Sequence, residues 1–247
     1  MTRARGNQER SWQVVPKAVL IGMALSLALQ IGWHAVQPAP VAVARDLSAP
    51  PPRMALRALS LGDPIFLSYV LLLRLQAFDN QPGISIPFKD LDYSKVIGWL
   101  DASLDLDPVS QYPLLLAATV YAQVPDEPKQ RAMLDFVFRR FLDDPARRWQ
   151  WLAHASVMAR HRLQDLQLAL RYAQALADHA ADASIPSWAR QMHIFLRADM
   201  GEHEAAKILL GGLLAGGTVQ DPHEIAFLMQ RLDALEKAEK SSIESKK

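Results

Sequence analysis

The longest apolar stretch of the chain lies near its N-terminus, at residues 18–36. Its 19 residues carry no charged side chain, and a helix of this length spans about 28 Å, close to the ~30 Å hydrocarbon core of a bilayer. The tail before it, residues 1–17, is basic, with Arg3, Arg5, Arg10 and Lys17 against the single acidic residue Glu9. Because basic flanks stay in the cytoplasm, we expect one transmembrane helix with a cytoplasmic N-terminus and everything after it translocated.

A cleaved signal peptide is the alternative interpretation of this stretch. Ala42-Val43-Ala44 fits the A-x-A cleavage pattern. The apolar run is nevertheless longer than a usual signal-peptide core of roughly 7–15 residues, and the pattern lies well beyond its end. These two observations favour an uncleaved signal-anchor.

One face of the predicted span is lined with small residues. Ala18, Gly22 and Ser26 recur every four positions, the spacing that lets two membrane helices approach closely. They are therefore candidate contacts with helices of a larger membrane complex.

A proline-rich linker is predicted at residues 37–53. It contains Pro38, Pro40, Pro50, Pro51 and Pro52. Proline fixes φ and removes a hydrogen-bond donor, so this stretch should be an extended, semi-rigid spacer. A folded body follows at residues 54–235, and the charged, Ser-rich end at 236–247 is predicted to be flexible.

The body has the apolar periodicity of amphipathic helices, which predicts an all-α fold. One helix stripe consists of Met133, Leu134, Val137, Phe138 and Phe141, and a second of Leu166, Ala169, Leu170, Ala173 and Leu176. Residues 65–75 are almost continuously apolar but too short to span a membrane, which predicts a buried core helix opened by Asp63-Pro64. A short extended segment is predicted only at residues 84–86.

Prolines recur through the body at a regular period. Asp107-Pro108, Asp144-Pro145, Ile185-Pro186 and Asp221-Pro222 are 37, 41 and 36 residues apart. Between them lie predicted helix pairs, 109–123 with 128–142, 147–160 with 163–179, and 187–200 with 202–214. Aspartate before proline can end one helix and cap the next. A two-helix unit at this period predicts an α-solenoid.

Part of this pattern resembles the tetratricopeptide repeat (TPR). Residues 201–210, GEHEAAKILL, resemble its inter-helix turn and second helix, with Gly201 at the turn and Ala206 at the small packing position. Residues 165–173 resemble the same helix in the preceding unit, and 93–108 the end of another. The resemblance covers about 140 residues, and its period exceeds the usual 34. It implies degenerate TPR-like pairs, with a non-TPR helical bundle as the alternative.

Composition and charge narrow the possible chemistry. The 247 residues include 27 basic, 26 acidic and no cysteine side chains, which excludes disulfides, cysteine-ligated metals and thiol nucleophiles. Residues 1–45 hold five basic and one acidic residue, leaving 22 basic and 25 acidic in the remainder. The translocated part is therefore mildly acidic, and no nucleic-acid partner is expected.

No catalytic or metal-binding motif is found in the chain. His203-Glu204 and His223-Glu224 do not extend to H-E-x-x-H, so no metal or other cofactor is expected. The carboxylate pairs Asp90/Asp92, Asp105/Asp107 and Asp143/Asp144 lie at predicted helix ends, where aspartate caps backbone donors rather than catalysing reactions.

A cluster of arginine and tryptophan is the most distinctive surface feature. It consists of Arg139, Arg140, Arg147, Arg148, Trp149 and Trp151, with Arg160 and Arg162 farther on. This is the composition of an interface hot spot, although the arginines could simply neutralise Asp143 and Asp144. In TPR proteins the first helices of the pairs line the binding groove, so the resemblance makes Trp151, His154, Arg190 and Arg197 the candidate groove residues.

These observations predict a protein-binding scaffold rather than an enzyme. The layout is similar to single-pass bacterial envelope proteins whose TPR domain faces the periplasm, which implies a protein or peptide partner, an inner-membrane location and a role in assembling or secreting an envelope complex. The alternatives are a helical enzyme acting on the cell wall, with Glu202, Glu204 and Glu224 open to mutational test, and a structural subunit of a larger membrane complex.

Overall fold

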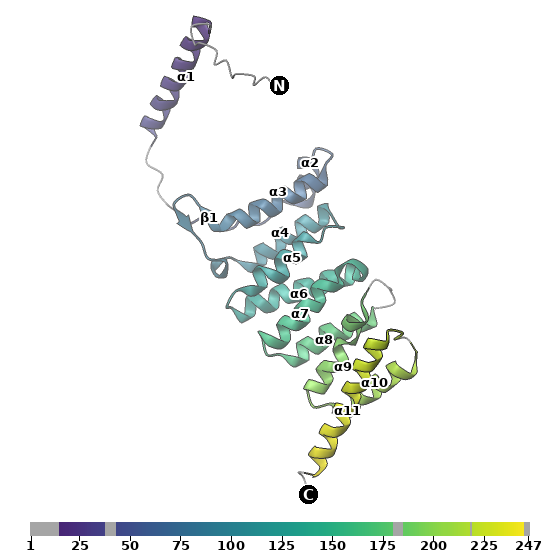
Figure 1. Cartoon of the computed structure of the whole chain (residues 1–247). Coiled ribbons are helices and arrows are strands. Elements are labelled where there is room, and N and C mark those ends of the chain that lie inside the picture. Colours follow the sequence, from purple (N-terminus) through teal and green to yellow (C-terminus); the bar gives the residue numbers. More distant parts are fainter. Residues whose placement is uncertain (1–14, 38–42, 180–184, 218, 245–247) are drawn as a thin grey trace, which may run out of the picture. The chain divides into compact units, whose positions relative to one another are not determined.

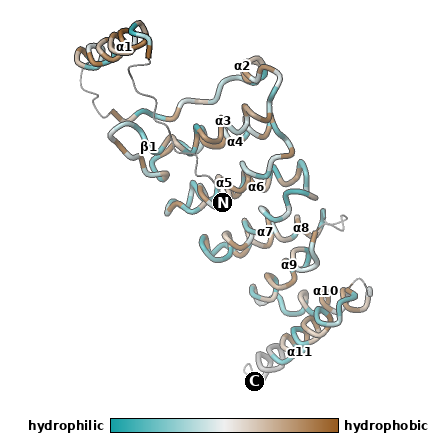
Figure 2. Tube along the Cα trace, turned by 45° about the horizontal axis from the view of Figure 1, so that its top comes forward, coloured by the Kyte–Doolittle hydropathy of each residue, from teal (hydrophilic) through white to brown (hydrophobic). Residues whose placement is uncertain are grey.

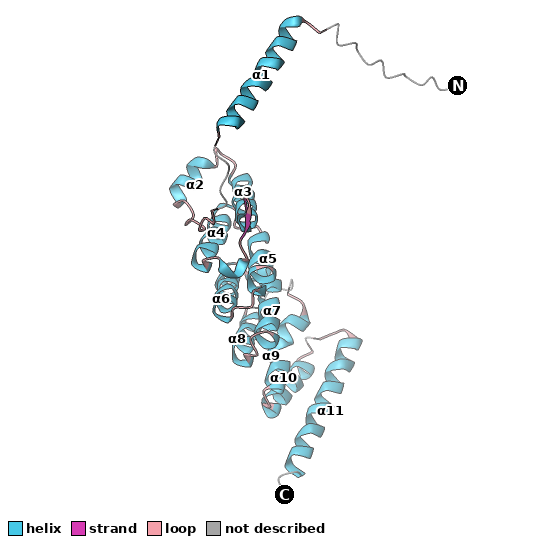
Figure 3. Cartoon of the chain, turned by 90° about the vertical axis from the view of Figure 1, so that its left-hand side faces the viewer, coloured by secondary structure: helices cyan, strands magenta, loops and turns pink. Residues whose placement is uncertain are grey.

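The computed structural model describes residues 15–37, 43–179, 185–217 and 219–244. The chain forms two compact units, residues 1–43 and 44–247, and the described part is all-α, with eleven α-helices and one short hairpin (Figures 1 and 3). Residues 1–14 of the predicted cytoplasmic tail and Ala42 of the alternative cleavage pattern lie outside the described residues.

The first unit contains helix α1, Lys17–Val36, which confirms the extent of the predicted apolar helix. It is long and apolar enough to cross a membrane, and Figure 2 shows its largely hydrophobic composition. Its residues are exposed. Ala18, Gly22 and Ser26 share this exposure, and the space beside Gly22 is open. The small-residue face is therefore accessible to another helix within the described structure.

The second unit is a succession of helices that begins with α2, Arg53–Leu59. The others are α3 (Pro64–Gln76), α4 (Tyr93–Leu106), α5 (Tyr112–Thr119), α6 (Glu127–Asp143), α7 (Pro145–His161), α8 (Leu166–Asp178), α9 (Ser187–Asp199), α10 (His203–Ala215) and α11 (Pro222–Glu244). A hairpin of β1 (Asn80–Gln81) and β2 (Ile84–Ser85) follows α3, which confirms the predicted extended segment. Helix α11 continues past residue 235, into the predicted flexible tail.

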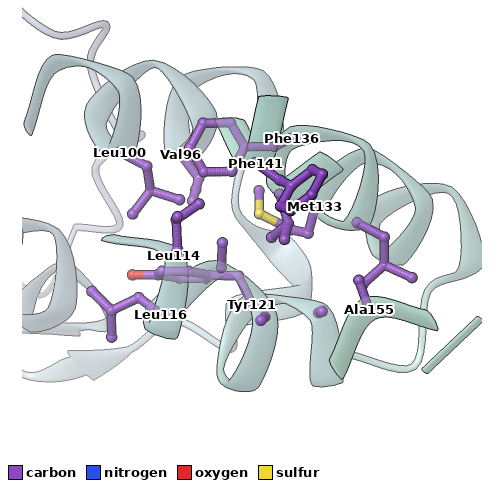
Figure 4. Close-up of a cluster of buried hydrophobic side chains, with 14 of the residues drawn as sticks. Val96, Leu100, Leu114, Leu116, Tyr121, Met133, Phe136, Phe141 and Ala155 are labelled. Atoms are coloured by element: carbon purple, nitrogen blue, oxygen red, sulfur yellow. The ribbon is translucent and has the colours of Figure 1, made fainter. Parts of the chain in front are cut away.

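Successive helices of this unit pack against one another in chain order (Figure 1). Contacts join α3 with α4 and run from α6 through each neighbour to α11. Helices two places apart also touch, since α4 contacts α6 and α5 contacts α7. A central group of buried apolar side chains fills the space between α4, α5 and α6 (Figure 4). It includes Val96, Leu114, Tyr121, Met133 and Phe141. A second, smaller cluster joins α9, α10 and α11.

Aspartates cap many of these helices, as the sequence predicts. Asp63, Asp126, Asp144 and Asp165 each accept a hydrogen bond from the backbone N–H three residues later. Asp144 ends α6 and begins α7, whereas the helix expected at 109 begins only at Tyr112. There Asp107 accepts from the Val109 N–H within a turn, and proline in the first helical turn sets the later start of α5.

The TPR-like segments form helices with buried small residues. Gly201 has φ +80° at the turn between α9 and α10, a conformation that glycine adopts without steric cost. Ala206 in α10 and Ala169 in α8 have no exposed surface. Close helix packing at these positions therefore depends on a small side chain.

The second half of the predicted linker belongs to the folded unit. Leu47 is 3% exposed within the main core, and the Trp99 indole N–H donates a 2.8 Å hydrogen bond to the Ser48 carbonyl. A Cβ on Gly98 would come within 3.2 Å of the Pro50 ring, so glycine permits this close approach. Residues 44–52 therefore pack against the body instead of forming a free spacer.

Helix α3 differs from the buried core helix predicted at residues 65–75. Ser68, Leu71, Leu72 and Leu75 are buried against the body, and the Ser68 hydroxyl lies 2.6 Å from that of Ser103 in α4. The opposite face, which includes Ile65, Phe66 and Leu73, is exposed and also apolar. Continuous apolar sequence carries no periodicity that could have distinguished the two faces.

Candidate functional site

An arginine-lined cavity of about 390 Å³ lies where α2, the end of α4, the end of α6 and the start of α7 meet. We call it the arginine cavity. Its lining contains five arginines and three aspartates, which are Arg53, Arg57, Arg140, Arg147, Arg148, Asp105, Asp143 and Asp144. The lining therefore carries a surplus of positive charge.

Arg148 is the buried member of this group, with 4% of its surface exposed. Its guanidinium donates to the carbonyl oxygens of Arg140 and Pro108 at 2.5 and 2.8 Å and lies 3.4 Å from the Asp143 carboxylate. Its Nε is buried and has no hydrogen-bond partner among the described residues. Burial lowers the pKa of Arg148, and the Asp143 charge opposes that shift. Arginine nevertheless stays protonated in proteins, so the positive charge remains.

Three other arginines of the cavity are paired with carboxylates. Arg53 lies 2.7 Å from Asp105, and Arg147 2.5 Å from Asp144. Arg140 contacts Asp143 at 3.0 Å and also pairs with Asp101 at 2.7 Å. These ion pairs confirm that arginines of the sequence cluster neutralise Asp143 and Asp144, the simpler interpretation of that cluster.

Arg57 differs from the other arginines of the cavity. It is exposed, and within the part of the chain that the structure describes its guanidinium forms no ion pair or hydrogen bond. An anionic group entering the cavity would meet this free charge, whereas the Arg148 Nε is buried. The arrangement thus suits a carboxylate or phosphate, which guanidinium groups bind through paired N–H donors.

The sequence cluster identified only part of the cavity. Arg140, Arg147 and Arg148 line it, whereas Arg139 lies outside and pairs with Asp135 at 3.2 Å. Arg53 and Arg57 come from the predicted linker boundary and the start of the body, far away in sequence. Only the packing of α2 against α4 brings them to the site, and no local pattern signals that contact.

The predicted groove residues of α7 are both half-buried. The Trp151 indole N–H donates a 2.7 Å hydrogen bond to the Gln111 side chain, and its ring packs against the main core. Trp149 instead lies edge-on to Trp188 of α9, with ring centroids 5.7 Å apart. The Nε2 atom of His154 is buried without a partner among the described residues.

The predicted groove residues of α9 have different surroundings. Arg190 lines a second cavity, of about 290 Å³, with residues of α9, α10 and the start of α11. Arg197 pairs with Glu202 at 2.8 Å. Arg190 and Arg197 therefore lie near residues at α10 and α11, whereas the Trp151 side chain is hydrogen-bonded to Gln111, just before α5. His193, also in the second cavity, has its pKa lowered by burial, and its Nδ1 lies 2.8 Å from the Arg190 carbonyl.

Within the described residues, no three histidine, aspartate or glutamate side chains are grouped as a metal site. The main feature of the described residues is a positively charged cavity on an all-α body. This body follows an apolar N-terminal helix. No protein-family model, curated protein or solved structure matches the chain.

Proposed function

We propose that the chain is a membrane-anchored, non-enzymatic binding module whose helical body takes an acidic segment of a partner protein in the arginine cavity. In this proposal α1 spans the inner membrane of a bacterium, and the body lies in the periplasm, where it assists assembly or secretion of an envelope complex. The observation that carries the proposal is the surplus of arginine around a cavity that retains the free Arg57.

The regular spacing of inter-helix contacts supports a solenoid of helix pairs. Side-chain hydrogen bonds repeatedly join residues 33–40 positions apart, close to the proline period; examples are Ser68–Ser103, Gln76–Tyr112, Arg131–Asp165, Trp151–Gln111 and Gln191–Glu224. Contacts of α4 with α6 and of α5 with α7 are those expected when equivalent helices of neighbouring pairs stack. Solenoids of this kind present extended binding surfaces, which fits a protein partner.

The test is a crosslinking pull-down from membranes that contain the full chain. We expect Arg57→Glu to reduce recovery of the partner several-fold, because it reverses the free charge at the cavity while breaking no ion pair or side-chain hydrogen bond of the described residues. The control is Arg139→Glu, the same charge reversal at an exposed arginine outside the cavity, which also breaks the ion pair with Asp135. Trp151→Ala and Arg190→Ala test the groove predicted from the sequence in the same experiment.

Two outcomes would contradict the proposed site. Equal recovery by Arg57→Glu and wild type would exclude the arginine cavity as the binding position. Equal losses in Arg57→Glu and Arg139→Glu would show a general charge effect rather than a site. Circular dichroism of each variant establishes that the helical body is retained.

A further inference from the structure

An apolar surface covers the exposed side of α3 and the corner between α2 and α3. We call it the α2–α3 face and define it by Leu59, Leu61, Ile65, Phe66, Tyr69, Val70 and Leu73, all of which are exposed. Ile65, Tyr69 and Leu73 lie at i, i+4 and i+8, and therefore on one side of the helix. Phe66 is 65% exposed and Leu61 93% exposed. A contiguous apolar surface of this kind marks an interaction site.

The corner of this face carries a backbone conformation that favours glycine. Leu61 has φ +48°, where a side chain other than glycine or asparagine is strained by roughly 1–2 kcal/mol. The Leu61 side chain contributes little to packing against the body, because almost all of it is exposed. Strained residues that persist are often part of a functional surface, so this outward leucine indicates a partner outside the unit.

The composition of these two helices favours an apolar partner. Helices α2 and α3 contain no acidic residue, and their arginines have places outside the face. Arg53 pairs with Asp105, Arg57 lines the arginine cavity, and Arg74 lies over the Trp99 ring. The hydropathy of α2 and α3 together reaches that of a membrane span, although the two are bent by 112°.

The distance from the anchor also favours the membrane. The folded unit begins at Ala44, and α1 ends at Val36. Eight peptide units therefore join them, and a fully extended chain of that length spans at most about 29 Å. The chain therefore holds Ala44, the first residue of the folded unit, within that distance of the end of α1.

We propose that the α2–α3 face lies on the surface of the membrane in which α1 is anchored, with its apolar side chains in the interface. This inference rests on the anchoring role of α1 in the proposed function. It assigns the face to the lipid surface rather than to a second copy of the chain.

The experiment uses the full chain in vesicles that contain phosphatidylglycerol. Because the sequence has no cysteine, a single cysteine at Phe66 can carry an environment-sensitive fluorophore without removing other thiols. Leu29, which is 74% exposed on α1, reports anchoring, and Val157, which is 44% exposed on α7, reports a position away from the face. We expect a lipid-borne quencher to quench the labels at positions 66 and 29 several-fold more than the label at 157. A label at Leu73 repeats the test.

The outcomes separate this inference from the anchor. Quenching at position 29 without quenching at 66 and 73 would overturn the inference and leave the anchor intact. Loss of quenching at 29 as well would show that anchoring itself fails. If the label at 66 is shielded from a water-soluble quencher only at high protein density, a second copy covers the face, which also overturns the inference. Replacing Phe66 and Leu73 by serine in the Tyr69-labelled chain should lower the lipid quenching of that label.

Discussion

At the scale of single residues, two buried tyrosines form a matched pair that differs in hydrogen bonding. The Tyr93 hydroxyl donates to the Tyr121 carbonyl at 2.8 Å, whereas the Tyr121 hydroxyl is buried without a partner among the described residues. We expect Tyr93→Phe to lower the free energy of unfolding by about 1 kcal/mol, since it removes a satisfied bond. Tyr121→Phe should leave it unchanged or raise it, because it removes a hydroxyl that is already desolvated.

Urea denaturation of the two variants checks this difference. Burial raises the pKa of both phenols, so neither ionises near neutral pH and the comparison is free of charge effects there. The two rings lie edge to face, with centroids 6.3 Å apart, and phenylalanine preserves that packing. Equal losses in the two variants would mean that the Tyr121 hydroxyl has a partner in solution.

The arginine cavity shows which site residues could not be predicted from the sequence. Adjacent arginines identified Arg140, Arg147 and Arg148, because a local cluster is visible in one stretch of chain. Arg57 became part of the cavity only through packing between helices that are about 45 positions apart in sequence. Single-sequence patterns carry no information on such contacts, so the most accessible charge of the candidate site was missed.

At the scale of helices, Asp165 joins a cap to an inter-helix ion pair. Its carboxylate accepts from the Leu168 N–H at 2.9 Å and lies 2.7 Å from Arg131 in α6. We expect Asp165→Ala to cost about 1–2 kcal/mol through loss of the cap. Asp165→Asn keeps an acceptor for the cap and should cost less than about 1 kcal/mol, the usual value of an exposed ion pair.

The same residue predicts a pH dependence. The Leu168 N–H and then Arg131 lower the pKa of Asp165 below its usual 3.8. The unfolded chain therefore binds this proton more readily, and the stabilisation is fully present above pH 3.8 and is lost as pH falls through the folded-state pKa. Urea midpoints should show a constant difference between wild type and Asp165→Ala near neutrality that narrows only in acid. A difference that grows in acid would contradict the assignment.

Helix boundaries were the most predictable feature at this scale. Aspartate and proline act within one turn, so the starts of α6, α7, α9 and α11 lie within two residues of positions marked by proline. The start of α5 deviates because Pro113 sets the first turn instead of Pro108. The exposed face of α3 was not predictable, since burial depends on which neighbours the rest of the fold supplies.

At the scale of the whole molecule, the boundary between α1 and the body sets the length of the segment that joins them. The sequence predicted a spacer to residue 53, because proline content alone does not show whether an extended segment is free or packed. Here Leu47, Ser48 and Pro50 contact the folded unit. Only residues 37–43 then separate α1 from the residues that pack against the body, so the joining segment is short.

Two shortened chains test this boundary, one beginning at Ala44 and one at Arg53. The first retains Leu47 in the core and the Ser48 bond to Trp99, so we expect it to fold with the stability of the full-length body. The second loses both, and the buried leucine alone is worth about 2–5 kcal/mol. Thermal unfolding should therefore show a clearly lower midpoint for the chain beginning at Arg53, and Leu47→Ala in the longer chain should reproduce most of the loss. Equal midpoints would return residues 44–52 to the linker, and the bound on the distance between the body and the end of α1 would then relax by nine residues of extended chain, about 30 Å.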